Sequence, residues 1–338
     1  MPIEAQPEEL AGWLQIGAAL VAGFVCLAKG ADWLVGASSQ SARRYGVSML
    51  VIGLTVVAFG TSAPEIVVSV VAAMDGDVDL SLGNVLGSNV ANIGLVLGAC
   101  ALVLPRVLES KLGLRDVFWL FASVGLLWWV IADHEVSRTD AGILLGGYVV
   151  YAIHLFVTGR EAVVEEAGEV EEHYRQPALW ILIGLLSIAL GAKLVVFGAQ
   201  DGALRLGMPK SVVGLTVVAI GTSLPELAAG LGGAFKGESD ISLGNVVGSN
   251  VFNVIAVIGL VALVNPFVPV ATPDGSPDPL TVAFDRALGE DLFVVVGFSL
   301  AAVLLPAIGG SRGGRAKGLL LLAAYAAYSY WLFTSRAL

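Results

Sequence analysis

The residues of this chain best suited to chemistry are two glutamates inside long apolar stretches. Glu65 and Glu226 each end a Gly-Thr-Ser-x-Pro-Glu motif, which spans residues 60–65 and 221–226. A charged side chain at the centre of a bilayer costs about 2.5–3.5 kcal/mol on insertion scales, so such residues usually mark an ion pathway. Two carboxylates facing each other would suit Ca²⁺, which takes about 6–8 oxygen ligands. The alternative is that each glutamate is structural and pairs with a lysine such as Lys29 or Lys193.

The same motif should interrupt the helix that carries it. Proline lacks a backbone donor and kinks a helix, and glycine adds backbone freedom. A broken helix at membrane depth is tolerated where its backbone lines a cavity, and freed carbonyls there can coordinate sodium. The carbonyls that this break should release are those of Ala58, Thr61, Ala219 and Thr222.

A second motif, Gly-Asn-Val-x-Gly-Ser-Asn-Val-x-Asn, also occurs twice, at residues 83–92 and 244–253. Its serine and its last asparagine are four residues apart, so they share one face of a helix. The neutral oxygens offered in this way belong to Ser88, Asn92, Ser249 and Asn253. The alternative is that the asparagines of the motif only form hydrogen bonds between helices; it applies above all to Asn84, Asn89, Asn245 and Asn250.

Both motifs belong to a longer internal repeat. Residues 53–98 align without a gap on residues 214–259, and 26 of the 46 positions are identical. Self-similarity at a fixed offset, here about 161 residues, is the signature of a duplicated architecture. The chain therefore contains two equivalent halves, each with one copy of both motifs.

Composition and apolar blocks predict an all-α polytopic membrane protein. Hydrophobic residues make up 57% of the 338 residues and charged residues only 14%, and one span needs about 20 mostly apolar residues. Ten spans are predicted, at 11–40, 47–74, 81–104, 114–133, 138–158, 178–199, 211–234, 242–264, 289–309 and 318–335. Five spans per half is an odd number, so the second half enters the membrane from the opposite face. This predicts two inverted five-helix repeats, a layout common in secondary transporters.

The expected organisation is an N-terminal tail (1–10), a first repeat (11–158), an acidic loop (159–177) and a second repeat (178–338). Lysine and arginine are concentrated in alternate loops, so the positive-inside rule places both termini outside and the acidic loop in the cytoplasm. The expected location is the inner (plasma) membrane of a prokaryote. Cys26 and Cys100 lie in apolar blocks and predict no disulfide framework.

The paired motifs resemble the two alpha-repeats of the sodium/calcium exchanger family, within the cation/calcium antiporters. The resemblance implies an antiporter that moves Ca²⁺ outward against Na⁺, with the lipid bilayer and these ions as partners and no cofactor. It implies a calcium site formed by Glu65 and Glu226 with the carbonyls of Thr61 and Thr222. One implied sodium site consists of Glu65, Ser62, Ser88 and the Ala58 carbonyl; its mirror image consists of Glu226, Ser223, Ser249 and the Ala219 carbonyl.

The chain departs from the family pattern at one position. Family members often carry Asp where this chain has Asn253, opposite an Asn at the position of Asn92. A neutral asparagine could mimic a protonated aspartate, or it could change the coupling ion. Proton- or potassium-coupled exchange on the same scaffold is therefore the leading alternative, and a passive cation channel is a second one. An enzyme is not expected, since no nucleophile–base pair or His/Cys cluster occurs; nor is a nucleic acid or an obligate protein partner.

Overall fold

The computed structural model describes residues 7–109, 112–158, 174–207, 219–268, 278–308 and 313–336. Within these ranges the chain is helical throughout, apart from one isolated antiparallel bridge between Val136 and Phe267. Apolar side chains cover much of the outer surface, as a lipid-facing surface requires. The protein is therefore an all-helical, polytopic membrane protein.

Most of the predicted spans form helices long and apolar enough to cross a membrane. Seven such helices lie in the described ranges, and a bent pair, Met49–Thr61 and Ala63–Met74, brings the number to eight. The seven are Ala11–Tyr45, Leu80–Val103, Leu114–Asp133, Arg138–Thr158, Pro177–Arg205, Ser239–Val264 and Leu280–Ala307. The predicted span 211–234 lies partly outside the described residues. The predicted span 318–335 forms α17 (Gly314–Arg336), which is rich in tyrosine and less apolar than the others.

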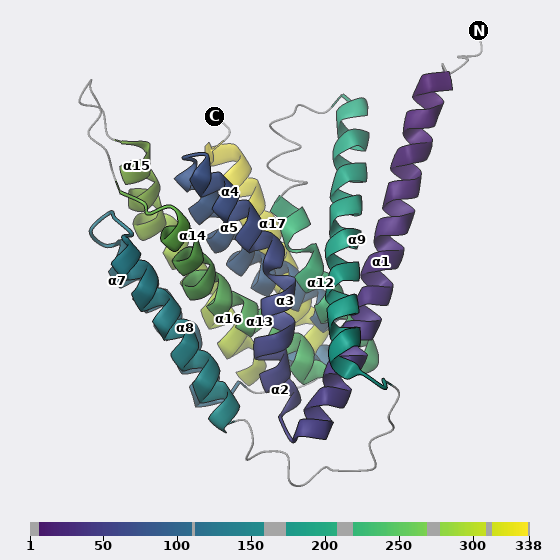
Figure 1. Ribbon diagram of the computed structural model, residues 1–338, viewed down its shortest axis with the longest axis horizontal. Helices are drawn as coiled ribbons and strands as arrows, with labels where there is room; N and C mark the ends of the chain where they lie inside the picture. The colour runs from purple at the N-terminus through teal and green to yellow at the C-terminus, as the bar shows by residue number, and fades with distance from the viewer. Residues whose placement is uncertain are drawn as a thin grey trace.

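Two long helices, α1 (Pro7–Tyr45) and α9 (Pro177–Arg205), pack along each other beside the rest of the bundle (Figure 1). Each begins close to the start of its predicted span and extends beyond its predicted end. Glycines allow their backbones to meet: a Cβ on Gly23 would lie 2.9 Å from the Gly191 carbonyl, and one on Gly30 would lie 2.8 Å from the Gly184 carbonyl. Because residue numbers rise along one helix as they fall along the other, the pair is antiparallel.

The buried centre of the bundle is built from the two repeated segments. In the first repeat the elements are α2 (Met49–Ile52), η1 (Gly53–Val57), α3 (Ala58–Thr61), α4 (Ala63–Met74), α5 (Val78–Ala91), η2 (Asn92–Leu97) and α6 (Gly98–Val103). In the second repeat they are α11 (Ala219–Thr222), α12 (Leu224–Lys236), α13 (Ser239–Val251), η5 (Phe252–Val257) and α14 (Ile258–Val264). The α5–η2–α6 and α13–η5–α14 rods are the most buried membrane-length helices of the described chain.

Both of these rods contain a π-helical stretch at the end of the second motif. Residue Asn92 begins η2, and Asn253 is the second residue of η5. A π-turn inserts an extra residue into an α-helix and is frequent at functional sites. The wider turn changes the direction of the side chains at Asn92 and Asn253 relative to a continuous α-helix.

The two repeats make their closest backbone contact where α13 crosses η1. A Cβ on Gly53 would lie 2.7 Å from the Ile241 carbonyl, and one on Gly248 would lie 2.5 Å from the Leu54 carbonyl. Only glycine permits helices to approach this closely. Gly53 of the first repeat and Gly248 of the second therefore let the two repeats pack closely against each other.

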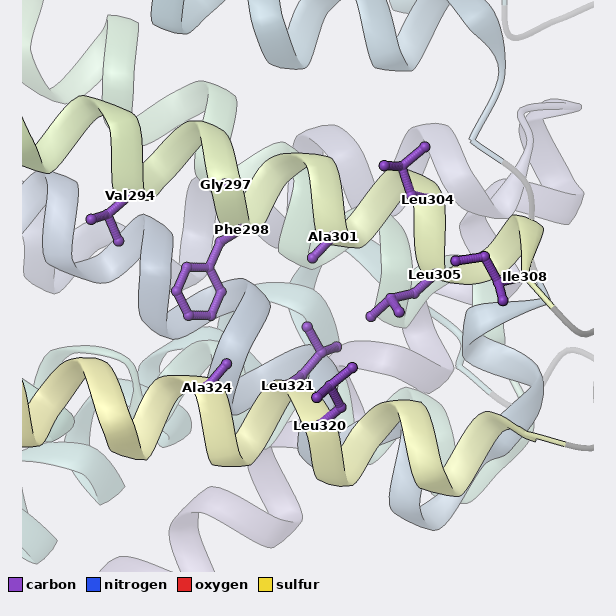
Figure 2. Close-up of a pocket in the computed structure, with 10 residues that line it drawn as sticks. All are labelled: Val294, Gly297, Phe298, Ala301, Leu304, Leu305, Ile308, Leu320, Leu321 and Ala324. Carbon is purple, nitrogen blue, oxygen red and sulfur yellow. The ribbon is translucent and has the colours of Figure 1, made fainter.

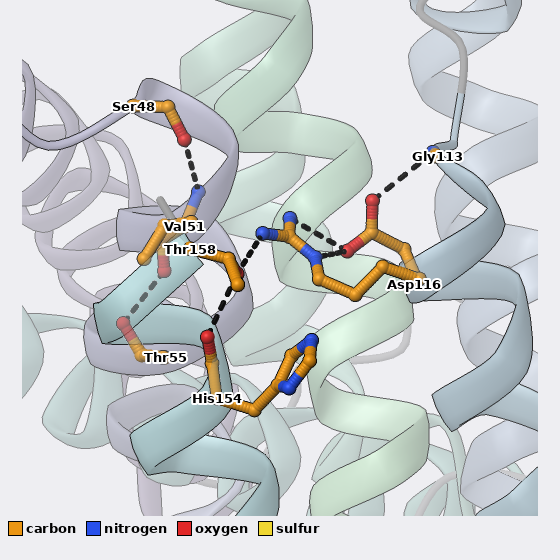
Figure 3. A network of polar contacts seen from close by, with 8 residues as sticks. Ser48, Val51, Thr55, Gly113, Asp116, His154 and Thr158 are labelled. Carbon is orange, nitrogen blue, oxygen red and sulfur yellow. Dashed lines mark hydrogen bonds and ion pairs between the residues drawn. The ribbon is translucent and has the colours of Figure 1, made fainter. Parts of the chain in front are cut away.

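The remaining helices surround this centre: η3 (Pro105–Leu108), α7 (Leu114–Ile131), α8 (Arg138–Thr158), α15 (Pro279–Arg286), η6 (Ala287–Asp291), α16 (Leu292–Ala307) and α17. A polar network joins the start of α7 to the end of α8 (Figure 3). Arg115 pairs with Asp116 at 2.8 Å and donates to Thr158 Oγ1 at 2.6 Å. Asp116 also accepts a hydrogen bond from the Gly113 N–H at 3.1 Å. The positive end of the α7 dipole stabilises a carboxylate at this position.

Candidate functional site

The helix that carries each glutamate is interrupted one turn before it. Ser62 separates α3 from α4 with φ −80° and ψ 10°, and Ser223 separates α11 from α12 with φ −86° and ψ 2°. The first break bends the chain by 44°. Pro64 and Pro225 follow each break at the N-terminal end of the next helix, where a missing N–H is tolerated. The interruption predicted from the Gly-Thr-Ser-x-Pro-Glu motifs is confirmed in both copies.

One carbonyl beside the first break differs from the expectation. The Ala58 oxygen is not released: it accepts the Ser62 N–H at 3.1 Å and the Thr61 hydroxyl at 3.4 Å. Pro64 has no N–H, so the carbonyl four residues earlier, that of Gly60, loses its usual helical partner. The proline thus frees the Gly60 oxygen, and the expected release of the Ala58 oxygen is wrong.

Both glutamates are completely buried, with 0% of each exposed. They lie in the first turns of α4 and α12. Ser88 Oγ donates to Glu65 Oε1 at 3.3 Å, and Ser62 Oγ donates to Glu226 Oε1 at 2.9 Å. The second bond crosses from one repeat to the other, so the two carboxylates lie in one site at the meeting of the repeats.

Two asparagines hold the backbone of the glutamates in place. Asn84 Nδ2 donates to the Glu65 carbonyl at 3.3 Å, and Asn245 Nδ2 donates to the Glu226 carbonyl at 3.1 Å. Thr61 Oγ1 in turn donates to Asn245 Oδ1 at 3.1 Å, again between repeats. Each of these asparagines lies four residues before the motif serine and so on a similar helix face, and the sequence left open whether they join the site.

A second polar cluster lies where the two rods of the centre cross. Asn89 and Asn250 occupy equivalent motif positions, and each donates to the other's backbone carbonyl, at 3.1 and 3.2 Å. Asn92 Nδ2 donates to Asn250 Oδ1 at 3.1 Å. The amides at 89 and 250 therefore join the helices, which is the role that the alternative interpretation gives them.

Several polar atoms of the site are buried but have no hydrogen-bond partner. An unpaired buried polar group is costly, and such groups are uncommon in folded proteins. Here they are concentrated around the carboxylates and the second motif: Glu65 Oε2, Glu226 Oε2, Ser223 Oγ, Ser249 Oγ, Asn92 Oδ1, and both side-chain polar atoms of Asn253. Oxygens kept buried and unpaired in this way are suited to bind a cation.

The donor set favours a hard cation. Carboxylate, hydroxyl, amide and carbonyl oxygens suit ions such as Ca²⁺ and Mg²⁺, whereas transition metals favour imidazole and thiolate. Within the described ranges no three His, Cys, Asp or Glu side chains converge. Lys29 and Lys193 are exposed, and none of the ion pairs of the described chain joins them to a glutamate. The glutamates therefore have serine hydroxyls as neighbours, not lysines.

A buried carboxylate pair where two broken-helix repeats meet is the arrangement of a secondary transporter for cations. Comparison with known proteins agrees with this class. Residues 16–157 and 177–334 match the family model described as sodium/calcium exchanger protein. The chain belongs to the sodium/calcium exchanger family and is a membrane antiporter.

Individual relatives match over almost the whole chain. The putative antiporter CaxA of Alkalimonas amylolytica is 38% identical over 94% of this chain and 98% of its own length. The sodium/calcium exchanger MaX1 of Methanosarcina acetivorans is 30% identical, with 93% and 97% covered. A solved structure of the sodium–calcium exchanger NCX_Mj superposes with a TM-score of 0.74 at 30% identity, over 93% of this chain and 97% of that one.

Proposed function

We propose that the protein exchanges Ca²⁺ for Na⁺, with sodium entry driving calcium out of the cytoplasm. The observation that carries this proposal is the pair of fully buried glutamates, Glu65 and Glu226, surrounded by unpaired oxygens. One Ca²⁺ would neutralise both carboxylates and draw further ligands from nearby hydroxyls and from the carbonyls of Thr61 and Thr222. The names of the relatives MaX1 and NCX_Mj support the same pair of ions.

Sodium would use the same carboxylates, so the two ions would compete. One sodium site would combine Glu65 with Ser88 and, once they give up their present hydrogen bonds, with Ser62 and the Ala58 carbonyl. The mirror site would combine Glu226 with Ser223, Ser249 and the Ala219 carbonyl, and Asn92 and Asn253 would lie between the two sites. Because each glutamate would serve both ions, binding of one would exclude the other, which is the physical basis of antiport.

The proposed architecture is ten helices in two inverted repeats, residues 11–158 and 178–338. Several symmetric features support it: the antiparallel packing of α1 on α9, the matched breaks at Ser62 and Ser223, and the reciprocal Asn89–Asn250 bonds. The start of α1 and the end of α17 lie at the same end of the bundle (Figure 1), as an even number of spans requires. In this arrangement the tail 1–10 and the C-terminus lie outside a prokaryotic inner membrane, and the loop 159–177 is cytoplasmic.

Transport would proceed by alternating access. The α1–α9 pair contacts both broken helices, with Leu185 beside Gly60 and Val196 beside Gly221, and Asp32 Oδ1 of α1 pairs with Lys236 Nζ of α12 at 2.7 Å. Sliding of this pair across the broken helices would open the site to one side of the membrane at a time. The ion pair between Asp32 of α1 and Lys236 of α12 thus joins the sliding pair to the centre.

The proposal is tested by radioactive calcium uptake into proteoliposomes loaded with sodium, and into matched vesicles loaded with potassium, with choline, or at acidic pH. Uptake that requires internal sodium is the expected result. Uptake driven only by potassium or protons would show that one of these, and not sodium, is the coupling ion. Currents through single open channels would instead support a passive pore.

Two substitutions test the site itself. Glu65→Gln and Glu226→Gln keep the size of the side chain and remove one of the two charges. Each is expected to abolish calcium uptake without changing the elution profile of the purified protein. Normal uptake in either variant would refute the proposed site, even if exchange in the parent protein is confirmed.

A further inference from the structure

An apolar groove runs along the outer side of the bundle between α16 and α17 (Figure 2). Its volume is about 500 Å³, and all ten residues that line it are apolar. Figure 2 shows Phe298 and Leu305 of α16 pointing toward Leu321 and Ala324 of α17. The groove extends along α16 from Val294 to Ile308.

The groove exists because small residues lie where large ones would close it. A Cβ added to Gly297 would meet no atom within 4 Å, so the space beside it is open. Ala301 and Ala324 also line the groove and contribute only a methyl group each. At its rim, Leu304 and Leu320 remain 53% and 58% exposed, and both face the region that lipid tails occupy. The groove is therefore a lipid-facing hollow that the protein itself does not fill.

The dimensions of the groove indicate the kind of occupant. Its lining spans 14 helical steps, or roughly 21 Å at about 1.5 Å per residue. A volume of about 500 Å³ over that length leaves a cross-section of roughly 24 Å². An α-helix about 10–12 Å wide is several times too large for this space, whereas a single hydrocarbon chain is of the right width.

One end of the groove carries positive charge. Lys317 lies three and four residues before Leu320 and Leu321, on the same face of α17. Arg315 Nε donates to the Leu102 carbonyl at 3.3 Å, which holds this arginine beside the end of α6. The exposed Arg106 lies on the neighbouring η3, against which Gly314 packs. Among the described residues of η3 and the first turn of α17, the basic side chains Arg106, Arg315 and Lys317 outnumber the acidic ones.

The start of α17 adds to this charge. Its first turn begins at Gly314, and the free N–H groups of a helix N-terminus attract phosphate. A phospholipid has a narrow acyl chain and a charged phosphate. The groove has the width of such a chain, and the basic side chains at its end can pair with such a phosphate. We infer that the groove binds an anionic glycerophospholipid, with one acyl chain between α16 and α17 and its phosphate beside Arg315 and Lys317.

The bound chain would also contact a part of the protein close to the ion site. Phe298 forms part of the groove, and a Cβ on Gly94 would lie 2.8 Å from the Phe298 ring. Gly94 is the third residue of η2, the π-helical stretch that begins at Asn92. Occupancy of the groove would therefore stabilise the packing of Phe298 against η2. This inference concerns lipid binding and does not depend on which ion drives transport.

The test is native mass spectrometry of the delipidated, detergent-purified protein after addition of phosphatidylglycerol or phosphatidylcholine with identical acyl chains. The expected result is preferential retention of one phosphatidylglycerol per chain. Gly297→Leu fills the groove and should weaken that retention at least about fivefold, which corresponds to roughly 1 kcal/mol. Lys317→Gln leaves the groove open and should reduce the preference for phosphatidylglycerol over phosphatidylcholine.

The matched control is Gly146→Leu, which adds the same side chain at an exposed glycine of α8 where a Cβ would likewise meet no atom within 4 Å. This variant should retain lipid like the parent protein, and both leucine variants should keep its thermal stability. Equal retention in Gly297→Leu and the parent protein would overturn the inference. So would equal retention of phosphatidylcholine and phosphatidylglycerol by the parent protein, or a dimer that Gly297→Leu dissociates.

Discussion

Replacing Gly248 by alanine should force the two repeats apart at their closest contact. The added Cβ would lie 2.5 Å from the oxygen, 2.6 Å from the Cα and 2.7 Å from the carbonyl carbon of Leu54. Non-bonded carbon atoms prefer a separation of about 3.5–4.0 Å. All three atoms belong to the backbone and cannot rotate away, so α13 would have to move by about 1 Å.

The magnitude follows from two opposing effects. Overpacking a well-packed interior costs about 1–3 kcal/mol, and a backbone-to-backbone clash belongs at the upper end of that range. Alanine is up to about 1 kcal/mol more favourable than glycine inside a helix, which offsets part of this cost. A net loss of about 2 kcal/mol would lower the Tm by roughly 3 °C, because the unfolding entropy of about 2.1 cal/mol/K per residue is summed over 338 residues. The shift would also displace Asn245 and Ser249, so calcium uptake should fall with stability.

The assay compares thermal unfolding in detergent and calcium uptake in proteoliposomes with those of Gly230→Ala. Gly230 is also buried, but a Cβ there would meet only side-chain atoms, Cys100 Sγ at 3.0 Å and Val96 Cγ1 at 3.1 Å. The equivalent position in the first repeat is Ser69, which already has a Cβ. Gly230→Ala should therefore unfold close to the parent Tm. A Gly248→Ala variant that unfolds within about 1 °C of the parent would refute the steric argument.

Two further predictions use other contacts of the site and its surroundings. Asn253→Leu replaces two buried, unpaired polar atoms, so stability should stay the same or rise while sodium-dependent uptake falls; Asn250→Leu removes bonds to two asparagines and should lower the Tm. A less stable Asn253→Leu protein would contradict this. Asp32→Asn breaks a half-exposed pair worth about 0.2–1 kcal/mol, so the Tm should hardly change while the exchange rate changes by at most about 5-fold. The double variant Asp32→Lys with Lys236→Asp swaps the two charges and should restore the parent exchange rate. If it does not, loss of this ion pair is not the cause of the changed rate in Asp32→Asn.

The sequence predicts the parts of this fold that depend on local chemistry. A proline shortly after Gly-Thr-Ser interrupts the helix, because it lacks an N–H group and clashes with the preceding turn. The breaks at Ser62 and Ser223 therefore follow from the motif alone. The apolar blocks likewise predict most of the spans, because lipid requires a helix wherever it surrounds the backbone. The boundaries of α1 and α9 were less predictable, since polar residues beyond the apolar block continue the helix.

Features that depend on packing between distant segments were not predictable. The resemblance placed Ser62 beside Glu65, the glutamate of its own motif, but its hydroxyl donates to Glu226. That choice depends on how the broken helices of the two repeats cross, and no local pattern encodes the crossing. The π-turn that begins at Asn92 is of the same kind, because no local sequence pattern marks it. The structure thus shows mainly which side chains of one repeat contact those of the other, which the sequence does not.

The duplicated motifs also give a site whose halves are not equivalent in this conformation. Ser62 and Ser88 of the first repeat each donate to a glutamate, whereas the equivalent Ser223 and Ser249 have no hydrogen-bond partner. Equal motifs differ in this way when the rotamers or the backbone around them differ. An inverted transporter would exchange the conformations of its halves when it changes the side that is open. Ser223 would then donate to Glu65, and the first-repeat serines would become the ones left for a cation.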